Sequence, residues 1–456
     1  VKRFRVCYYA DWVLGASRFE HGQTVFAEYD PSAEAILASN AFSGRDGVAF
    51  LCSDQRDTVA ALDRGAFLGA GGVRFPAGIE IMEKAPAPVS GWACGALAAD
   101  VALRPGARKR ILFVMGYAKD EDRARELAAQ AVAEGMAEQA RARTEAFWEN
   151  RLGSFRIRTP DRALDILVNG FLPYQVTACR LWARTGAYQA GGAYGFRDQL
   201  QDVLALLYTH PGEVRDHILL CARHQFPEGD VQHWWHPPAT GVRTRISDDL
   251  LFLPYVVSRY VKETGDVSVL SETVPYITGP SLQESQRDAY FEAAESGEAG
   301  DVFEHCVRAF RLVLARRGEH GLPLMLGGDW NDGMNEVGRE GKGESVWLAF
   351  FLCDVLRRFS GVASAYGREE EAAALDGEAR MLNENIEAHA WDGAWYLRGF
   401  YDDKTPLGSK DSEECQIDCL SQAWAAISGA ATSERAKRAM DAVLGHLLDE
   451  AHGLLK

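Results

Sequence analysis

The structural class of the chain changes within one stretch, residues 120–150, which reads DEDRARELAAQAVAEGMAEQARARTEAFWEN. Asp120, Glu121 and Asp122 give it an acidic first turn, and the Ala, Glu and Arg residues that follow are strong helix formers. We therefore predict a long helical linker and assign residues 119–158 to it. Because the sequence before the linker differs in kind from the sequence after it, we expect the linker to separate two domains.

Short β-rich runs make up the chain before the linker, and Gly, Pro, Asp and Ser residues separate them. The clearest runs are Arg5–Tyr9, Thr24–Tyr29, Val48–Cys52 and Ile111–Met115. Strands at this spacing predict a β-sandwich, to which we assign residues 1–118. Val1 opens almost directly onto strand-like sequence without an initiating Met, so we expect this domain to be incomplete at its N-terminus.

Nearly every segment after the linker has the apolar period of a helix. Helices are predicted at 161–182, 198–209, 212–224, 247–264, 300–317, 344–359, 366–389, 416–429 and 433–449. Consecutive helices with long loops between them fit a bundle, a solenoid or a toroidal barrel of helical hairpins. No repeat of fixed length is visible, which argues against the regular solenoids.

Composition limits the partners and the location of the chain. Hydrophobic residues make up 47% of its 456 residues, and its longest apolar runs are shorter than a transmembrane helix. The 49 Lys and Arg against 65 Asp and Glu give a net charge of −16, which repels nucleic acid and anionic membranes. We therefore predict a soluble cytoplasmic protein with no nucleic-acid partner and no membrane segment in this chain.

The nine cysteines are scattered, odd in number and mostly set among apolar residues. This usage is typical of free thiols in a reducing cytoplasm and not of a disulfide framework. Cys415 and Cys419 would share one side of a helix, but no second pair of Cys or His lies nearby in the sequence to complete a zinc site. We predict no metal site.

Polar residues concentrate in the loops of the helical region, and the first such loop, residues 184–198, reads RTGAYQAGGAYGFRD. It runs into a predicted helix, and a helix start with cations beside it favours anions. Its glycines also leave the backbone open to a ligand. We expect a binding loop that uses Gln189, Tyr194 and Arg197. The alternative is that Asp198 caps the helix, with Arg197 as its surface partner.

The second loop, residues 229–238, reads GDVQHWWHPP. Trp234 and Trp235, flanked by His233 and followed by prolines, are expected to form a stiff, flat, hydrogen-bonding surface that stacks on sugar rings. Support for a metal site at these histidines is weak. The prolines prevent a helix that would place both imidazoles on one face, and no third ligand follows at a familiar spacing.

Ser247, Asp248 and Asp249 come shortly after the aromatic loop. Ser is a common helix cap, and acidic residues stabilise the first turn of a helix. We therefore expect Ser247 to cap the next helix, with both aspartates in its first turn.

The third loop, residues 327–335, reads GGDWNDGMN and places two carboxylates beside an indole. A carboxyl near Trp330 would be desolvated, which raises its pKa and keeps a proton available near neutral pH. Asp329 or Asp332 could therefore act as a general acid, and the residues alone do not choose between them. The alternative is a turn in which Asp329 and Asn331 bond to nearby backbone.

Four motifs occur in a specific order: YGFRDQLQD at 194–202, QHWWHPP at 232–238, DWNDG at 329–333 and GESVW at 343–347. Together with YYADWVLG at 8–15 they resemble the inverting glycoside phosphorylases of the cellobiose phosphorylase family, glycoside hydrolase family 94. The likeness is strongest to the phosphorylase-like C-terminal region of cyclic β-1,2-glucan synthases, and it runs over essentially the whole chain.

The resemblance implies a multidomain fold in which the β-sandwich and the helical linker precede a toroidal (α/α)6 barrel at residues 159–456. It implies an enzyme that cleaves β-linked glucan, β-1,2-glucan in particular. Inorganic phosphate would be the co-substrate and glucose 1-phosphate the product, with no cofactor.

The resemblance also implies roles for single residues. The second Asp of the family's Asp-Trp-Asn-Asp motif is the general acid, which selects Asp332, and the Trp lines the sugar site, which points to Trp330. Asp329 is left with a supporting, sugar-binding role. The family's phosphate-binding Arg falls on Arg184, and the sugar-binding Asp of its Phe-Arg-Asp motif falls on Asp198.

Two departures from the family pattern bear on these expectations. A second sugar-binding Arg has no counterpart, because Ala193 and Tyr194 stand in its loop, which argues against cellobiose as substrate. The family's further phosphate ligands, a His and a Thr-Gly pair, come from a last part of the barrel that would follow Lys456, so we expect a barrel truncated at its C-terminus.

Two alternatives to a phosphorylase therefore stay open. One is a catalytically incomplete glucan-binding domain of a cyclic glucan synthase, and the other is an inverting glycoside hydrolase. A homodimer, or fusion to a membrane glucan synthase at the cytoplasmic face of the inner membrane, also stays open.

Overall fold

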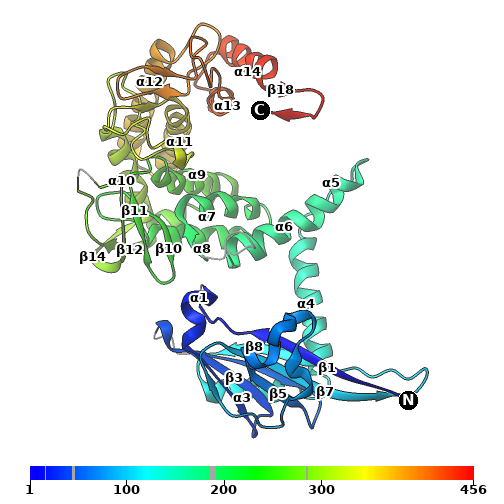
Figure 1. Cartoon of the computed structure of the whole chain (residues 1–456). Helices are drawn as coiled ribbons and strands as arrows, with labels where there is room; N and C mark the ends of the chain where they lie inside the picture. The colour runs from blue at the N-terminus through cyan, green and yellow to red at the C-terminus, as the bar shows by residue number, and fades with distance from the viewer. Residues whose placement is uncertain (16, 44–46, 184–191, 284–285) are drawn as a thin grey trace. The chain divides into compact units, whose positions relative to one another are not determined.

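The computed structural model describes residues 1–456 apart from 16, 44–46, 184–191 and 284–285. Contacts between its elements divide the described chain into two compact units, Val1–Ser154 and Phe155–Lys456 (Figure 1). Most of the predicted linker therefore belongs to the first unit.

Two antiparallel sheets form the first unit. Five strands make one sheet in the order β6-β2-β3-β4-β8, and three strands make the other in the order β1-β7-β5. The larger sheet consists of β2 (Val25–Asp30), β3 (Ala35–Asn40), β4 (Val48–Ser53), β6 (Val89–Ser90) and β8 (Phe113–Ala118), and the smaller of β1 (Lys2–Asp11), β5 (Val59–Asp63) and β7 (Ala93–Leu103). The predicted N-terminal β-sandwich is confirmed.

Alternate strand residues fill the space between the two sheets. Val25 and Ala27 of β2 and Ile36 of β3 share one buried cluster with Leu62 of β5 and Leu97 of β7. The residues between them face away, because successive side chains of a strand point to opposite faces. Each buried Val, Leu or Ile side chain stabilises the fold by about 1.5–3 kcal/mol, so this apolar layer holds the sandwich together.

The segment predicted as one long helix is two helices, α3 (Glu121–Ala131) and α4 (Met136–Gly153). The break falls at Gly135, whose φ of 78° lies in the left-handed region that glycine tolerates. The Asp120 carboxylate caps α3 by accepting a backbone hydrogen bond from its first turn at 2.8 Å. Ala124 of α3 packs on the larger sheet, so α3 is part of the sandwich unit and not a free linker.

Helices and their connections form the second unit. The α-helices and π-helical segments are α5 (Arg162–Ile166), η5 (Leu167–Phe171), α6 (Leu172–Gln175), η6 (Val176–Trp182), α7 (Phe196–Val203), α8 (Pro211–Ala222), α9 (Phe252–Thr264), α10 (Val302–Ala315), α11 (Val346–Ala365), α12 (Glu369–His389), α13 (Cys419–Ile427) and α14 (Ser433–Leu447). Short 3-10 turns lie at η7 (Leu204–Leu206), η8 (Asp249–Leu251), η9 (Val267–Ser271) and η10 (Asp332–Met334). Each predicted helix is present, with ends that differ by a few residues. Helices α7, α9, α11 and α13 contact one another in turn, and α8, α10, α12 and α14 pack against them, which gives two layers (Figure 1).

Apolar packing around α11 stabilises this unit. Trp347, Phe351 and Phe359 of α11 are buried, and α9, α12 and α13 surround the helix. Its first turn is capped by Ser345, whose hydroxyl accepts a hydrogen bond from Leu348 N at 3.0 Å. The start of α11 is therefore fixed in position.

Short strands occupy connections that the sequence pattern predicted as loops. β9 (Tyr194–Gly195), β10 (Gln232–His236), β11 (Thr240–Thr244) and β13 (Asp288–Glu292) form one sheet, β12 (Thr273–Thr278) pairs with β14 (Ala294–Asp301), and β15 (Glu344–Ser345), β16 (Gly399–Phe400) and β17 (Pro406–Leu407) form another sheet. They are short and carry many polar residues, so no apolar alternation revealed them. They hold the polar side chains of these connections in place.

In the described part of the chain, no helix combines the length and the apolar character needed to cross a membrane. The nine cysteines are free thiols, as predicted. Among the described residues, no group of three or more His, Cys, Asp and Glu side chains could hold a metal ion.

Candidate active site

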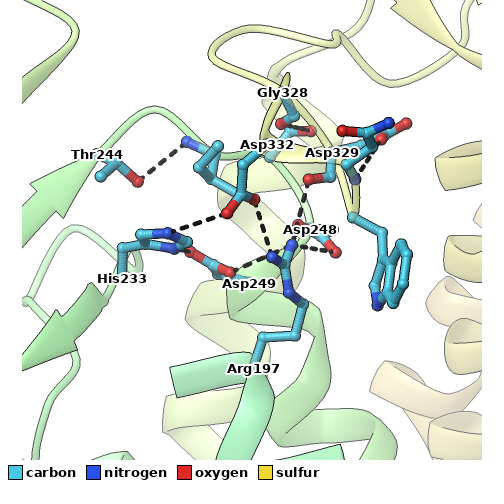
Figure 2. A network of polar contacts seen from close by, with 12 residues as sticks. Arg197, His233, Thr244, Asp248, Asp249, Gly328, Asp329 and Asp332 are labelled. Carbon is cyan, nitrogen blue, oxygen red and sulfur yellow. Dashed lines mark hydrogen bonds and ion pairs between the residues drawn. The ribbon is translucent and has the colours of Figure 1, made fainter. Parts of the chain in front are cut away.

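Arg197, the second residue of α7, ties together separate loops of the second unit (Figure 2). Its Nη1 donates to Asp248 Oδ1 at 2.9 Å and to the carbonyl oxygen of Asp329 at 3.2 Å. Its Nη2 donates to Asp332 Oδ1 at 2.8 Å. Arg197 is only 8% exposed, and a buried guanidinium is stable only where carboxylates compensate its charge. The sequence predicts Arg197 as a sugar ligand, whereas the donors described here bond to protein acceptors.

Asp332 begins a short 3-10 turn, η10 (Asp332–Met334), and the Asn331 side chain fixes that turn by accepting a backbone hydrogen bond at 3.0 Å. Arg197 holds one carboxylate oxygen of Asp332, and the other lies 3.5 Å from His233 Nε2. The Asp332 side chain is 49% exposed. The protein therefore holds the Asp332 carboxylate in position by these contacts, and the carboxylate is still accessible to a ligand.

The pKa of Asp332 is lowered, not raised as the sequence pattern predicted. Partial burial pushes this pKa up, but hydrogen bonds and charge attraction from His233 and Arg197 outweigh burial. The indole of Trp330 does not desolvate the carboxyl, because Trp330 is 47% exposed and lines a different cavity. Asp332 is thus a carboxylate in this arrangement, and it needs a proton before it can act as an acid.

His233, on β10, is the second partner of Asp332. Its Nδ1 lies 2.7 Å from Asp249 Oδ2, and this contact orients the ring with Nε2 toward Asp332. Burial lowers the pKa of His233, but the carboxylates of Asp249 and Asp332 outweigh burial and raise the pKa to about 10. The imidazole is therefore a cation at neutral pH.

Asp248 and Asp249 are predicted as first-turn residues of a helix capped by Ser247; they do lie at the start of a short 3-10 turn, and both also belong to this network. Burial raises the pKa of Asp248 well above its ordinary range, although Arg197 opposes the effect. Asp249 holds His233 and lies 3.8 Å from Arg197. The Ser247 hydroxyl donates to a carbonyl oxygen of the facing loop at 3.0 Å and does not cap the helix.

Asp329 is fully buried, and its carboxylate bonds to protein donors, so its predicted sugar-binding role stays a prediction. Its carboxylate accepts hydrogen bonds from Arg398 Nη2 at 2.6 Å, from Arg398 Nη1 at 2.7 Å and from Ser345 Oγ at 2.6 Å. The two buried charges compensate each other. Because Ser345 also caps α11, this ion pair anchors the loop that carries Asp332 to the core.

Asp332 and His233 line a cavity of about 1240 Å³, and Trp234, Tyr290 and Arg316 share its wall. The rings of Trp234 and Tyr290 lie 5.7 Å apart. Aromatic faces with a few polar donors between them suit a ligand that has both apolar faces and hydroxyl groups. A sugar chain is such a ligand.

Arg316 and Tyr290 are lining residues that the sequence analysis missed. Burial lowers the pKa of Arg316; the charge of Asp230 opposes this shift, and the charges of Arg245 and Arg243 add to it. No carboxylate among the described residues lies at ion-pair distance from Arg316, so its guanidinium can donate to a ligand in the cavity. A lone Arg after a helix and a lone Tyr in a polar strand form no motif, which is why no pattern indicated them.

The two adjacent indoles do not form one surface, contrary to the prediction. Trp235 is 2% exposed and stacks on His224 with ring centroids 3.7 Å apart, whereas Trp234 lines the cavity. Successive strand residues point to opposite sides, so β10 cannot present both indoles to one ligand. Trp234 remains a candidate sugar-binding residue, and Trp235 supports the strand from the core.

Trp330 lines a second, smaller cavity of about 310 Å³. Tyr255, Trp347 and Trp424 share that wall, and Trp330 Nε1 donates to Gln201 Oε1 at 3.3 Å. The Asp-Trp-Asn-Asp motif therefore contributes side chains to two cavities, and Trp330 stays a candidate for stacking on a sugar.

Asp198 and Tyr194 lie at the start of α7. The Asp198 carboxylate is 3.8 Å from Arg180 Nη2 and folds over Gly195, where a Cβ would lie 1.9 Å from Asp198 Oδ2. The Tyr194 hydroxyl donates to a main-chain carbonyl of η6 at 2.8 Å. Neither is among the described residues that line the Asp332 cavity, so their sugar contacts stay predictions.

Arg184 and Gln189, predicted to bind phosphate and sugar, lie outside the described residues. Their roles stay predictions as well.

The fold defines a protein in which a β-sandwich accompanies a helical barrel of the (α/α)6 type, with a cavity around Asp332 in the helical unit. The chain belongs to the glycosyl hydrolase 94 superfamily. Residues 147–455 match the catalytic domain of that superfamily, and residues 1–133 match the glycosyl hydrolase 94 supersandwich domain.

Relatives of two kinds are similar to the chain over most of its length. The cyclic beta-(1,2)-glucan synthase NdvB of Rhizobium meliloti (strain 1021) is 44% identical over 458 residues, covering 98% of this chain and 16% of that protein. The solabiose phosphorylase of Paenibacillus borealis is 31% identical over 454 residues, covering 97% of this chain and 55% of that enzyme. The N,N'-diacetylchitobiose phosphorylase of Vibrio furnissii is 29% identical, covering 78% of this chain and 45% of that enzyme. The chain thus spans about half or less of the length of these relatives.

A bacterial glucoamylase solved in complex with acarbose has a similar fold. Its TM-score is 0.60 at 10% sequence identity, and the match covers 97% of this chain and 61% of the glucoamylase. This likeness concerns the fold alone, and it confirms the predicted combination of a β-sandwich with a helical barrel.

Proposed function

We propose that this protein is an inverting glycoside phosphorylase of β-linked glucan, with β-1,2-glucan as substrate and glucose 1-phosphate as product. The observation that carries the proposal is the position of Asp332, half exposed on the wall of a large cavity, gripped by Arg197 and close to His233. Membership of a superfamily with phosphorylases among its named relatives supports it.

One carboxylic acid is sufficient for this reaction. In an inverting cleavage, an acid protonates the leaving glycosidic oxygen while the attacking group approaches the opposite face of the sugar ring. Water would need a second carboxylate as a base, but phosphate is already nucleophilic. Asp332 would protonate the bridging oxygen, and phosphate attack on a β-linkage would give α-glucose 1-phosphate.

Arg184 is the proposed phosphate-binding cation, on the strength of its place in the family motif. Its loop leads directly into α7, whose second residue, Arg197, holds Asp332. A phosphate bound by this loop and an acid held by Arg197 would therefore be positioned by one short segment of chain. We propose no metal or cofactor, since the acid and the phosphate supply the chemistry.

The Asp332 cavity suits an oligosaccharide. Its volume of about 1240 Å³ exceeds the range of about 300–1,000 Å³ that is typical of small-molecule sites. Trp234 and Tyr290 offer ring faces, and Arg316 offers a donor for hydroxyl groups. The β-1,2 linkage comes from the name of the NdvB relative. We further propose that the protein acts in the cytoplasm, alongside or fused to a glucan synthase.

Product analysis with and without phosphate tests the function. The purified protein is incubated with linear β-1,2-gluco-oligosaccharides, and both glucose 1-phosphate and glucose are measured. Release of glucose 1-phosphate that depends on phosphate is expected. Release of glucose without phosphate would identify an inverting hydrolase instead, and glucan binding without any product would identify a binding domain.

A further inference from the structure

Under the proposed function, on which this inference rests, Asp332 must carry a proton, yet its surroundings hold it as a carboxylate. A proton lies close by on the imidazole of His233, whose Nε2 is 3.5 Å from Asp332 Oδ2 (Figure 2). The other ring nitrogen, Nδ1, is anchored 2.7 Å from Asp249 Oδ2. The three side chains form a chain of contacts that ends at the cavity.

We propose that His233 delivers the catalytic proton: when glucan and phosphate occupy the site, the hydrogen on His233 Nε2 moves to Asp332 Oδ2 while Asp249 holds the ring. His233 acts through Asp332 and is thus a positioning residue. Asp249 suits its part because it is buried, and its Oδ1 has no hydrogen-bond partner within the described residues. The negative charge of Asp249 stabilises the imidazolium of His233, so His233 keeps its proton until the substrates bind.

Four ionisable side chains surround the imidazole or its direct partners. Asp249 on η8 (Asp249–Leu251) and Asp332 on η10 face the ring, and Arg197 on α7 and the neighbouring Asp248 lie behind them. While water reaches Asp332, the pair of imidazolium and carboxylate is the favoured form. A bound glucan excludes water, which disfavours the charged forms of both side chains. This change drives the proton from His233 to Asp332.

Protons are neither gained nor lost by the enzyme over one turnover. The Nε2–H bond of His233 breaks as the Oδ2–H bond of Asp332 forms, which leaves a neutral imidazole. Asp332 then passes the proton to the glycosidic oxygen as that carbon–oxygen bond breaks and a phosphate oxygen bonds to the anomeric carbon. Hydrogen phosphate loses its own proton on becoming the sugar phosphate dianion, and a proton from solvent restores the cation when the products leave and water returns.

Two substrates that differ in their leaving groups test this role in His233→Asn. β-1,2-Glucan needs protonation of its leaving oxygen, whereas 2,4-dinitrophenyl β-glucoside releases a phenolate that needs none. At pH 7 we expect a loss of about 100- to 1,000-fold on glucan, because a carboxyl of ordinary pKa near 4 is protonated in only about one molecule per thousand there. Phosphorolysis of the dinitrophenyl glucoside should change by less than about threefold, since it requires no general acid.

The pH profile gives a second readout. The alkaline limb of kcat/KM on glucan should move down by several pH units in His233→Asn, because the proton then resides on Asp332 alone. His217→Asn is the matched control. That imidazole lies on α8 and contacts the carbonyl oxygen of Glu213, so both activities should persist.

Each outcome decides a different point. Equal losses on both glucosides, or an unmoved alkaline limb, would overturn the role of His233 and leave the proposed function standing. A wild-type protein inactive on both glucosides would overturn the proposed function and this role with it. Should His233→Asn fail to fold, nitrogen-15 NMR of the wild type decides the matter. The His233 imidazolium should become neutral when glucan binds with sulfate in place of phosphate, and an imidazolium in both states would contradict proton delivery.

Discussion

Arg197 Nη2 lies 2.8 Å from Asp332 Oδ1, although 135 positions separate the two residues in the chain. The contact joins the start of α7 to the loop of the Asp-Trp-Asn-Asp motif and sets the position of the proposed acid. The same guanidinium compensates the fully buried carboxyl of Asp248. One side chain thus supports both the stability of the barrel loops and the geometry of the site.

Replacing Arg197 by Gln should lower the free energy of unfolding by about 3–5 kcal/mol, because it leaves buried carboxylates without their cation. Unfolding in urea measures the change. Arg287→Gln is the matched control, since its ion pair with Glu336 is exposed and should contribute less than about 1 kcal/mol. A loss in Arg197→Gln no larger than in the control would contradict the structural role of Arg197.

Asp329→Asn should destabilise the protein and leave glucan affinity unchanged. The substitution breaks a buried ion pair with Arg398, which is expected to reduce the free energy of unfolding by roughly 3–5 kcal/mol. Denaturant unfolding and calorimetry on the folded variant measure the two effects. Unchanged stability together with weakened glucan binding would instead support the sugar-binding role predicted for Asp329.

The two adjacent indoles should respond in opposite ways. Trp235→Ala removes a buried ring from the core and should reduce the free energy of unfolding by about 3–5 kcal/mol. Trp234→Ala should leave stability nearly intact but weaken glucan binding by about two- to tenfold, as expected for one lost ring contact. Calorimetry with β-1,2-gluco-oligosaccharides distinguishes them, and similar effects of both substitutions on binding would contradict the opposite orientation of the rings.

Folding stability should depend on pH through His233. Its pKa of about 10 in the folded protein lies above the ordinary value of 6.5, so the folded state binds this proton more tightly than the unfolded state does. The contribution of His233 is therefore fully present below pH 6.5 and is lost as the pH rises toward 10. Asp332 has the opposite sign, because its pKa is lowered and its contribution is lost as the pH falls into the acid range.

Denaturant unfolding of the wild type and of His233→Asn across this pH range tests the prediction. The difference in unfolding free energy should be constant in mildly acidic solution and should shrink as the solution becomes alkaline. A difference that grows with rising pH would show that the imidazole is not stabilised as a cation.

Local pattern was sufficient to predict the sandwich and the helices, and the family resemblance added the arrangement of the helices as a toroidal barrel. The strands of the sandwich are short runs rich in apolar residues, with turn residues between them, and α11 carries a long apolar helical pattern that is buried in the structure. These signals lie within single segments. The break at Gly135 was missed because a lone glycine in a run of helix formers does not by itself end a helix.

The site depends on contacts between distant segments, which local pattern does not record. Asp248 and Asp249 look like ordinary helix-start residues, and only the fold brings them to Arg197 and His233. Burial separates Asp329 from Asp332, although both lie in one loop and share one chemistry. The family resemblance supplied the choice of Asp332 as the acid, and the fold supplied its partners.

The most direct measurement is the rate of glucose 1-phosphate release from β-1,2-gluco-oligosaccharides by the wild type and by Asp332→Asn at saturating phosphate. Glucan affinity is measured alongside by calorimetry. We predict that the wild type releases α-glucose 1-phosphate and that Asp332→Asn lowers kcat by about 10²- to 10⁴-fold, the usual contribution of a general acid, while it still binds glucan. Undiminished turnover in Asp332→Asn, or glucose release that does not require phosphate, would contradict a phosphorylase in which Asp332 is the acid.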